Sequence, residues 1–111
     1  MTSSDLFSLS GQRILVTGAA GSIGKELCRS FISDGAVLFA VDLNSKGLAA
    51  LQAEIEPLAG SCFAIACDLS DEKQRAEVVQ QVRQKTGHLD GAVFAAAYVG
   101  TSNLEGWAVD F

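Results

Sequence analysis

Apolar and polar positions along this chain follow two alternating patterns. Four short, mostly apolar runs are typical of buried strands, and the segments between them repeat apolar residues every three or four positions, as on one face of a helix. The runs cover residues 12–17, 36–41, 62–67 and 90–96. The pattern therefore predicts strands and helices in the order β-α-β-α-β-α-β.

Each predicted helix carries its own start and stop signals. Glycine follows all three, at positions 35, 60 and 87, where a left-handed residue can end a helix. The first helix is expected over residues 22–34, the second after a cap at Asn44 or Ser45, and the third from Ser70-Asp71-Glu72, whose acidic groups suit the helix dipole. The residues expected to face inward are Ile23, Leu27 and Phe31, then Leu48, Leu51, Ile55 and Leu58, then Ala76, Val79 and Val82.

The connections between these predicted elements are short. Buried strands joined in this way through helices form a parallel sheet with right-handed crossovers. We therefore expect an α/β fold in which a three-layer α/β/α arrangement surrounds a parallel sheet of strand order 3-2-1-4, ending after about four strands. The turn after the first strand then lies at the switch point of the sheet, where ligands bind.

That turn is the most informative segment of the chain. Glycines occur at positions 18, 21 and 24, where the first strand ends and the first helix begins. Glycine permits a tight turn and a close approach of the backbone, and a helix start offers unpaired N–H groups to an anion. The candidate cradle for a pyrophosphate consists of Gly18, Gly21, Ser22, Ile23 and Gly24.

A carboxylate stands at the end of the second strand, at Asp42. A carboxylate in that place can accept hydrogen bonds from both hydroxyls of an adenosine ribose, and it repels a 2′-phosphate. No Lys or Arg follows directly, because the next residues are Leu43, Asn44 and Ser45. We therefore expect NAD rather than NADP as the cofactor, with Asp42 and Leu43 in its site.

The composition argues against several other classes of protein. With 8 basic and 13 acidic residues the net charge is −5, which disfavours nucleic acid and anionic membranes as partners. No apolar run is long enough to span a bilayer, and the N-terminus lacks the pattern of a signal peptide, so a cytoplasmic location is expected. Cys28, Cys62 and Cys67 are expected to be buried, the latter two in one strand, and their spacing predicts no metal site.

Together these segments resemble the short-chain dehydrogenase/reductase family over nearly the whole chain. The resemblance is carried by TGAAGSIG at 17–24, Asp42, CDLSD at 67–71 and LDGAVFAAA at 89–97. It implies that residues 1–111 are part of a Rossmann-like NAD-binding domain in an oxidoreductase that interconverts an alcohol and a carbonyl by hydride transfer. It also implies that Asp68 and Leu69 lie beside the adenine, and that Ala95, Ala96 and Ala97 pack over the adenosine ribose.

Two departures from the family pattern matter. The single-domain branch of the family spaces its glycines as TGxxxGxG, whereas this chain has TGxxGxxG, the spacing of the longer epimerase-like branch, with Ser22 in the place of the middle glycine. After the fourth strand the family commonly has Asn-Asn-Ala-Gly, where this chain has Phe94-Ala95-Ala96-Ala97. The first departure leaves a nucleotide-sugar epimerase or dehydratase as an alternative.

The residues that perform the family's chemistry are missing from these 111 residues. Family members react through a Tyr-x-x-x-Lys pair and a Ser, and the single tyrosine here, Tyr98, is followed four positions later by Ser102. We therefore assign no catalytic residue and expect the chain alone to be inactive in hydride transfer. A non-catalytic nucleotide-binding module is a further alternative.

The fourth strand is expected to form an open edge of the sheet. Its residues are apolar and carry no charge from Gly91 onward, a composition that favours pairing with another strand. We therefore expect a chain that is marginally stable or self-associated through this strand. The other partners implied are the dinucleotide and an unidentified small hydroxyl or carbonyl substrate.

Overall fold

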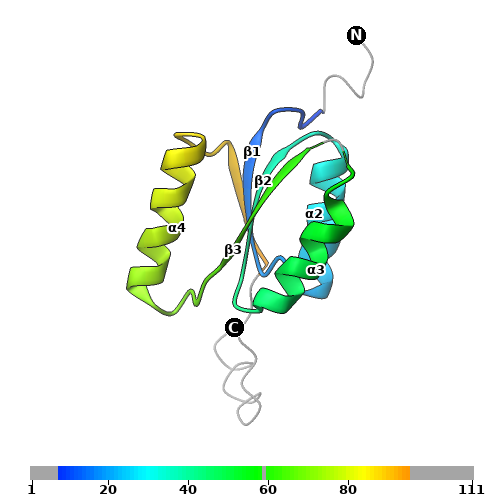
Figure 1. The fold of residues 1–111 in the computed structure, drawn as a ribbon. Coiled ribbons are helices and arrows are strands. Elements are labelled where there is room, and N and C mark those ends of the chain that lie inside the picture. The colour runs from blue at the N-terminus through cyan, green and yellow to red at the C-terminus, as the bar shows by residue number, and fades with distance from the viewer. Residues whose placement is uncertain (1–7, 59, 96–111) are drawn as a thin grey trace, which may run out of the picture.

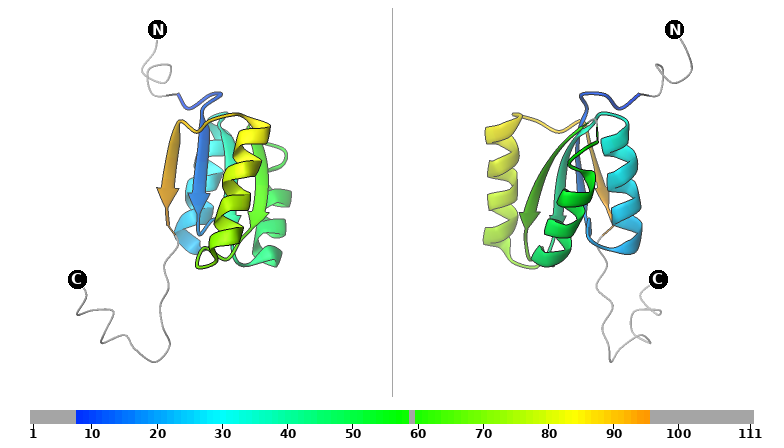
Figure 2. Two further views of the ribbon diagram at one scale, coloured as in Figure 1. Left: turned by 90° about the vertical axis from the view of Figure 1, so that its left-hand side faces the viewer. Right: turned by 45° about the vertical axis from the view of Figure 1, so that its right-hand side comes forward.

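A computed structural model describes residues 8–58 and 60–95 of the chain. The four strands form one parallel sheet of order β3-β2-β1-β4, with α2 and α3 on one face and α4 on the other (Figures 1 and 2). This three-layer arrangement confirms the predicted fold class and strand order. The elements in chain order are β1 (Arg13–Thr17), α2 (Ser22–Ser33), β2 (Val37–Asp42), α3 (Ser45–Ile55), β3 (Ser61–Ala66), α4 (Glu72–Lys85) and β4 (Gly91–Phe94).

The central strand β1 is paired on both sides, so the turn that follows it lies in the middle of one end of the sheet. Leu15 is level with Phe39 of β2 and with Ala92 of β4. We call the end at which the strands finish the carboxyl end and the opposite one the amino end. Because all four strands run the same way, the segments that follow β1, β2, β3 and β4 meet at the carboxyl end.

The strand boundaries differ slightly from the predicted ones. β3 ends at Ala66, so Cys67 lies after the strand and not within it, although its N–H still donates to the Asp42 carbonyl (2.9 Å). β2 has its last residue at Asp42, so a longer β3 would have no partner beyond that point. β4 ends at Phe94, and Ala96 lies outside the described residues.

The buried face of α2 is displaced by one residue from the predicted one, although the predicted Phe31 still packs against the core. The buried positions are Gly24, Cys28 and Ile32, whereas Ile23 is 70% exposed. Gly24 accounts for the difference, because a Cβ atom there would come within 2.0 Å of the Gly18 carbonyl oxygen. The helix thus approaches the preceding turn through its glycine, and the apolar stripe through Ile23 lies to one side.

The inward face of α4 also differs from the prediction, whereas that of α3 largely agrees with it. On α4, Val78 and Val82 are buried, while Ala76 is exposed and Val79 is 51% exposed. A mostly polar helix has too few apolar residues to define its buried face by their spacing alone. On α3 the predicted stripe is buried at Leu48, Leu51 and Ile55, but not at Leu58.

The core has two parts, one on each face of the sheet. Under α2 and α3 it includes Val16, Leu38 and Ile32, and under α4 it includes Leu15, Phe39 and Val82. In the described ranges no helix is long and apolar enough to cross a membrane. The two core parts hold the strands in register and so fix the positions of the segments that follow them.

The two edges of the sheet differ in their protection. At the β3 edge, the Gln52 amide of α3 donates to the Cys62 carbonyl (3.3 Å), and the Lys85 ammonium lies 4.7 Å from the centre of the Phe63 ring. At the β4 edge the strand carries no charge, and Phe94 is 77% exposed. Charged and polar side chains deter unwanted strand pairing, so β4 is the less protected edge.

Candidate functional site

The turn between β1 and α2 presents backbone N–H groups at the carboxyl end of the sheet. Gly18 has a φ of 70°, and its carbonyl accepts the Gly21 N–H (3.0 Å), which closes the turn directly before α2. The N–H groups of Ser22, Ile23 and Gly24 belong to the first helical turn, which has no intrahelical acceptors for them. These donors, together with the positive end of the helix dipole, suit an anion.

The glycines of the turn are not equivalent. A Cβ atom at Gly24 would lie 2.0 Å from the Gly18 oxygen and 3.0 Å from the Ala19 Cα, so the turn could not keep its shape with a side chain there. A Cβ atom at Gly21 would meet the same oxygen at 3.3 Å, which is tight but can be relieved by a small shift. Gly24 is therefore required by a close approach, and Gly18 by its left-handed backbone.

Asp42 connects this turn to the next one. Its Oδ2 atom accepts the Ala20 N–H (2.9 Å) and its Oδ1 atom accepts the Asn44 N–H (2.8 Å). Each carboxylate oxygen has a second lone pair, so these bonds leave acceptor capacity for a ligand. The carboxylate predicted from the sequence thus lies beside the glycine turn and has a structural role as well.

Two residues outside the predicted site, Asn44 and Gly47, also lie where these two turns meet. Asn44 caps α3 by accepting the Gly47 N–H on its Oδ1 atom (3.0 Å). Gly47 faces Ala20 across the gap between α3 and the glycine turn, where a Cβ atom would come within 2.8 Å of the Ala20 Cβ. A glycine inside a helix disfavours helix formation, so Gly47 was the one signal in the sequence for a close approach here.

The segment after β3 brings a second carboxylate to the same end of the sheet. The Asp68 Oδ1 atom accepts from the Ser70 hydroxyl (2.6 Å) and the Ser70 N–H (3.0 Å), and these bonds lower the pKa of Asp68 below its ordinary value. Leu69 is half-buried against the core under α4. The half-buried Asp68 carboxylate is thus held ionised, in a turn fixed by its bonds to Ser70.

The other predicted site residues that the structure describes are held by fewer hydrogen bonds than Asp42 and Asp68. Ile23 and Leu43 are exposed at the carboxyl end, and Ala95 is half-buried, with its N–H donating to the Thr17 carbonyl (3.1 Å). Ala96, Ala97 and Tyr98 lie outside the described residues. Ile23 follows the glycine turn and Leu43 follows Asp42, so both exposed apolar side chains belong to the two segments that carry the polar groups.

The three thiols show no sign of a nucleophilic role. Burial raises the pKa of Cys28 to about 12 and that of Cys62 to about 11, and it also raises the pKa of Cys67. Only the thiolate is a strong nucleophile, so these cysteines act as small apolar side chains at neutral pH. The groups that the candidate site offers to a ligand are therefore backbone N–H groups and carboxylates.

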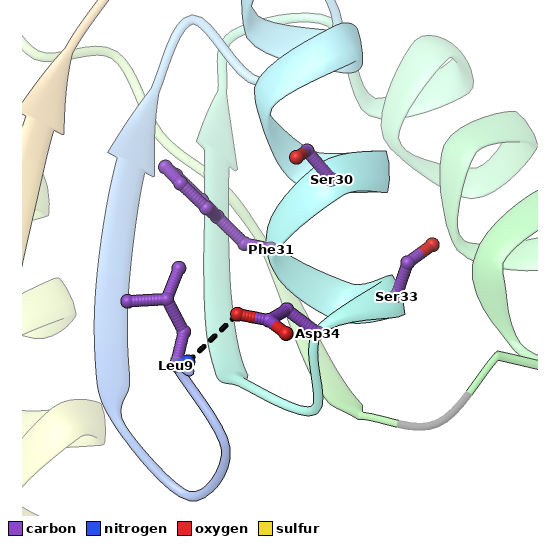
Figure 3. Close-up of a pocket in the computed structure, with 5 residues that line it drawn as sticks. All are labelled: Leu9, Ser30, Phe31, Ser33 and Asp34. Carbon is purple, nitrogen blue, oxygen red and sulfur yellow. Dashed lines mark hydrogen bonds between the residues drawn. The ribbon is translucent and has the colours of Figure 1, made fainter. Parts of the chain in front are cut away.

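A hollow at the amino end of the molecule has a different character (Figure 3). It lies beside the end of α2, and the Asp34 Oδ2 atom accepts the Leu9 N–H there (2.7 Å). This bond fixes the segment before β1 against α2. The residues that line the hollow are Leu9, Ser30, Phe31, Ser33 and Asp34. The carboxylate at this end is used to join two chain segments, and we assign the candidate site to the carboxyl end.

Comparisons with known proteins point to one family. Residues 12–108 match the sequence profile of the family described as short chain dehydrogenase. The 7alpha-hydroxysteroid dehydrogenase of Escherichia coli K12 is 31% identical over 111 residues, which cover 100% of this chain and 44% of the relative.

Solved structures show the same likeness. The crystal structure of a short-chain type dehydrogenase/reductase from Mycobacterium marinum is similar with a TM-score of 0.82 and 33% identity, over 90% of this chain and 40% of that one. An NAD+-bound xylitol dehydrogenase is similar with a TM-score of 0.78 and 26% identity, over 83% and 35%. The chain thus spans less than half the length of the proteins it matches.

Proposed function

This chain belongs to the short-chain dehydrogenase family, and on that premise we propose that it binds the adenosine diphosphate part of NAD at the carboxyl end of its sheet. We propose further that the chain is the dinucleotide-binding portion of an oxidoreductase that interconverts an alcohol and a carbonyl by hydride transfer. The observation that carries the proposal is the position of Asp42, which bonds to the glycine turn itself. One carboxylate and one row of free N–H groups thus lie side by side.

The pyrophosphate is assigned to the start of α2. The N–H groups of Ser22, Ile23 and Gly24 point out of the first helical turn, and Gly18 and Gly21 let the backbone approach the phosphates. Each donor that pairs with a phosphate oxygen satisfies a backbone group that the helix leaves unbonded. The proposed bond pattern therefore needs no positively charged side chain.

The adenosine ribose is assigned to Asp42. The remaining lone pairs of its carboxylate accept from the ribose hydroxyls, while Leu43 lies directly beside it. A 2′-phosphate in the same place would be repelled by the carboxylate, and neither Leu43 nor Asn44 offers a compensating charge. These features favour NAD over NADP, and the similar xylitol dehydrogenase structure holds NAD+.

The adenine and the far side of the ribose are assigned to the segments after β3 and β4. Asp68 and Leu69 supply a polar group and an apolar surface beside the base, and the small side chains of Ala95, Ala96 and Ala97 leave room for the ribose. Hydride transfer itself needs a proton donor such as the family's Tyr-x-x-x-Lys pair, which these 111 residues do not contain. We therefore expect the 111 residues to bind the dinucleotide without turning it over.

Titration of the 111-residue chain with NADH and NADPH in parallel, followed by calorimetry, tests the proposal. We expect saturable binding of NADH. Binding of NADPH should be at least tenfold weaker, or about 1.4 kcal/mol, because the Asp42 carboxylate repels the 2′-phosphate. Gly18→Val, which places a branched side chain at a φ of 70°, should abolish both, whereas Gly91→Ala, at an open position, should change neither. Equal binding of both cofactors, or none to a folded chain, would contradict the proposal.

We also infer that the chain associates with itself through β4 and that it acts in the cytoplasm, where free thiols such as these three persist. The support for association is the contrast between the covered β3 edge and the exposed Phe94. Sedimentation at increasing concentration should show a dimer for the native chain and a monomer for Phe94→Lys. A native chain that stays monomeric at high concentration would refute the association.

A further inference from the structure

Gly47 lies against both residues that hold the Asp42 carboxylate. A Cβ atom at position 47 would come within 2.8 Å of the Ala20 Cβ and within 2.8 Å of the Asn44 Nδ2 atom. Ala20 donates its N–H to one oxygen of Asp42 and Asn44 donates its N–H to the other. A side chain at position 47 would therefore press on both residues that donate to the carboxylate.

Ala20 is the neighbour that would have to move if a side chain were added. The Asn44 amide can shift by changing its side-chain torsions, at the expense of its cap on the Gly47 N–H, but the methyl group of Ala20 moves only with the backbone. α3 cannot easily retreat, because Leu48 and Leu51 anchor it in the core and the Arg29 guanidinium of α2 binds both carboxylate oxygens of Glu54 (2.9 and 3.0 Å). The displacement would thus fall on the glycine turn, at the Ala20 N–H.

We propose that Gly47 is a positioning residue that sets the glycine turn against Asp42 and so determines how well the site recognises the 2′-hydroxyl of the adenosine ribose. This inference rests on the proposed function, because it gives Asp42 the ribose as its ligand. Gly47 does not touch the nucleotide. It acts through Ala20, whose bond to Asp42 sets the direction of the free lone pairs.

The test compares the binding of ADP with that of 2′-deoxy-ADP, two ligands that differ only in the 2′-hydroxyl. The native chain should bind ADP about tenfold more tightly, as expected for one hydrogen bond to a charged group. Gly47→Ala should reduce this ratio to below about threefold, although alanine is the better helix former and should not reduce helix content. Gly91→Ala, a matched glycine with open space around it, should keep the native ratio.

A second variant separates positioning from a general loss of structure. Ala20→Gly in the Gly47→Ala background removes the opposing methyl group and should restore the ratio to near tenfold. A native ratio in Gly47→Ala, or a double variant that does not recover, would overturn the inference. A native chain that binds both nucleotides equally, or neither, would instead refute the proposed function, so the two failures are distinguishable.

Discussion

The two ends of the sheet use similar bonds for different purposes. At the amino end a carboxylate, Asp34, accepts the N–H of Leu9 and so joins the segment before β1 to the end of α2. At the carboxyl end a carboxylate, Asp42, also accepts backbone N–H groups, but it lies beside helix donors that have no intrahelical partner. The same carboxylate-to-backbone bond thus joins chain segments at one end and borders the proposed ligand site at the other.

Substitution of two glycines, one at each end of the sheet, should have the largest effects on stability and tests this contrast directly. Gly24 at the carboxyl end and Gly60 at the amino end both touch a carbonyl, since a Cβ atom would lie 2.0 Å from the Gly18 oxygen and 2.2 Å from the Ala36 oxygen. Alanine at either position should lower the free energy of unfolding by about 2 kcal/mol, through overpacking. Urea denaturation measures both losses.

Only one of these variants should affect the ligand. Gly24→Ala should weaken ADP binding at least tenfold, or about 1.4 kcal/mol, because the turn that supplies the N–H groups must move. Gly60→Ala should leave the affinity of the folded fraction within about twofold, or about 0.4 kcal/mol. Equal losses of affinity in the two variants would remove the distinction between the ends.

The two carboxylates give the next largest effect. Asp42→Asn should weaken ADP binding about tenfold and bring NADH and NADPH closer in affinity, because the charge that accepts from the ribose and repels a phosphate is gone. Asp34→Asn should leave both affinities unchanged and reduce stability by about 1 kcal/mol through its weakened bond to Leu9. Calorimetric titration and urea denaturation of both variants measure these changes, and an affinity loss in Asp34→Asn would contradict the assignment.

Substitution of Asp71 tests whether a carboxylate influences nucleotide affinity merely because it lies at the carboxyl end of the sheet. Asp71 caps α4 there by accepting the N–H groups of Lys73 (2.9 Å) and Gln74 (3.3 Å). Asp71→Ala should lower the free energy of unfolding by about 1 kcal/mol, the usual loss for such a cap, without changing nucleotide affinity. Asp71→Ser, which keeps a capping oxygen, should recover most of the stability, and a large affinity change in either variant would assign Asp71 to the site.

The smallest effect at neutral pH is expected from the buried cysteines in the core between the two ends, because their titration changes the free energy of unfolding only at alkaline pH. Burial raises the pKa of Cys28 to about 12 and that of Cys62 to about 11 from an ordinary value of 9.0, so the folded chain binds more protons than the unfolded one above that value. Stability should therefore be constant below pH 9 and fall as the pH rises toward 11. Urea denaturation at pH 8 and pH 10.5 measures the fall, and a Cys28→Ala, Cys62→Ala variant should show less of it.

The sequence was sufficient for the order of the elements and for the inward face of α3. That face consists of large apolar side chains, Leu48, Leu51 and Ile55, whose spacing defines it directly. The inward face of α2 could not be found in this way, because two of its buried positions are Gly24 and Cys28, and the helix is oriented by a contact with the backbone of Gly18. Periodicity identifies a face only when the face is made of large apolar residues.

The glycine turn and Asp42 were recognisable because their chemistry follows from residue type and order along the chain. The contact between Gly47 and Ala20 was not, since it depends on how closely two separate turns approach in space. The same holds for the protection of β3 by Gln52, which reaches the strand from a preceding helix. Such contacts require the relative placement of helices, which the pattern of one segment does not contain.

The position of β1 between β2 and β4 has a consequence for the order of assembly. The bond that joins Arg13 to Asp90, at the start of β4, closes a loop of 77 residues, whereas the bond between Ala20 and Asp42 closes one of only 22. The longer closure costs about 1 kcal/mol more in chain entropy, so the nucleotide turn and Asp42 can meet before the fourth strand joins. During synthesis, the glycine turn and Asp42, proposed to hold the pyrophosphate and the ribose hydroxyls, can thus come together early, and amide exchange should find β4 opening before the β1–β2 pair.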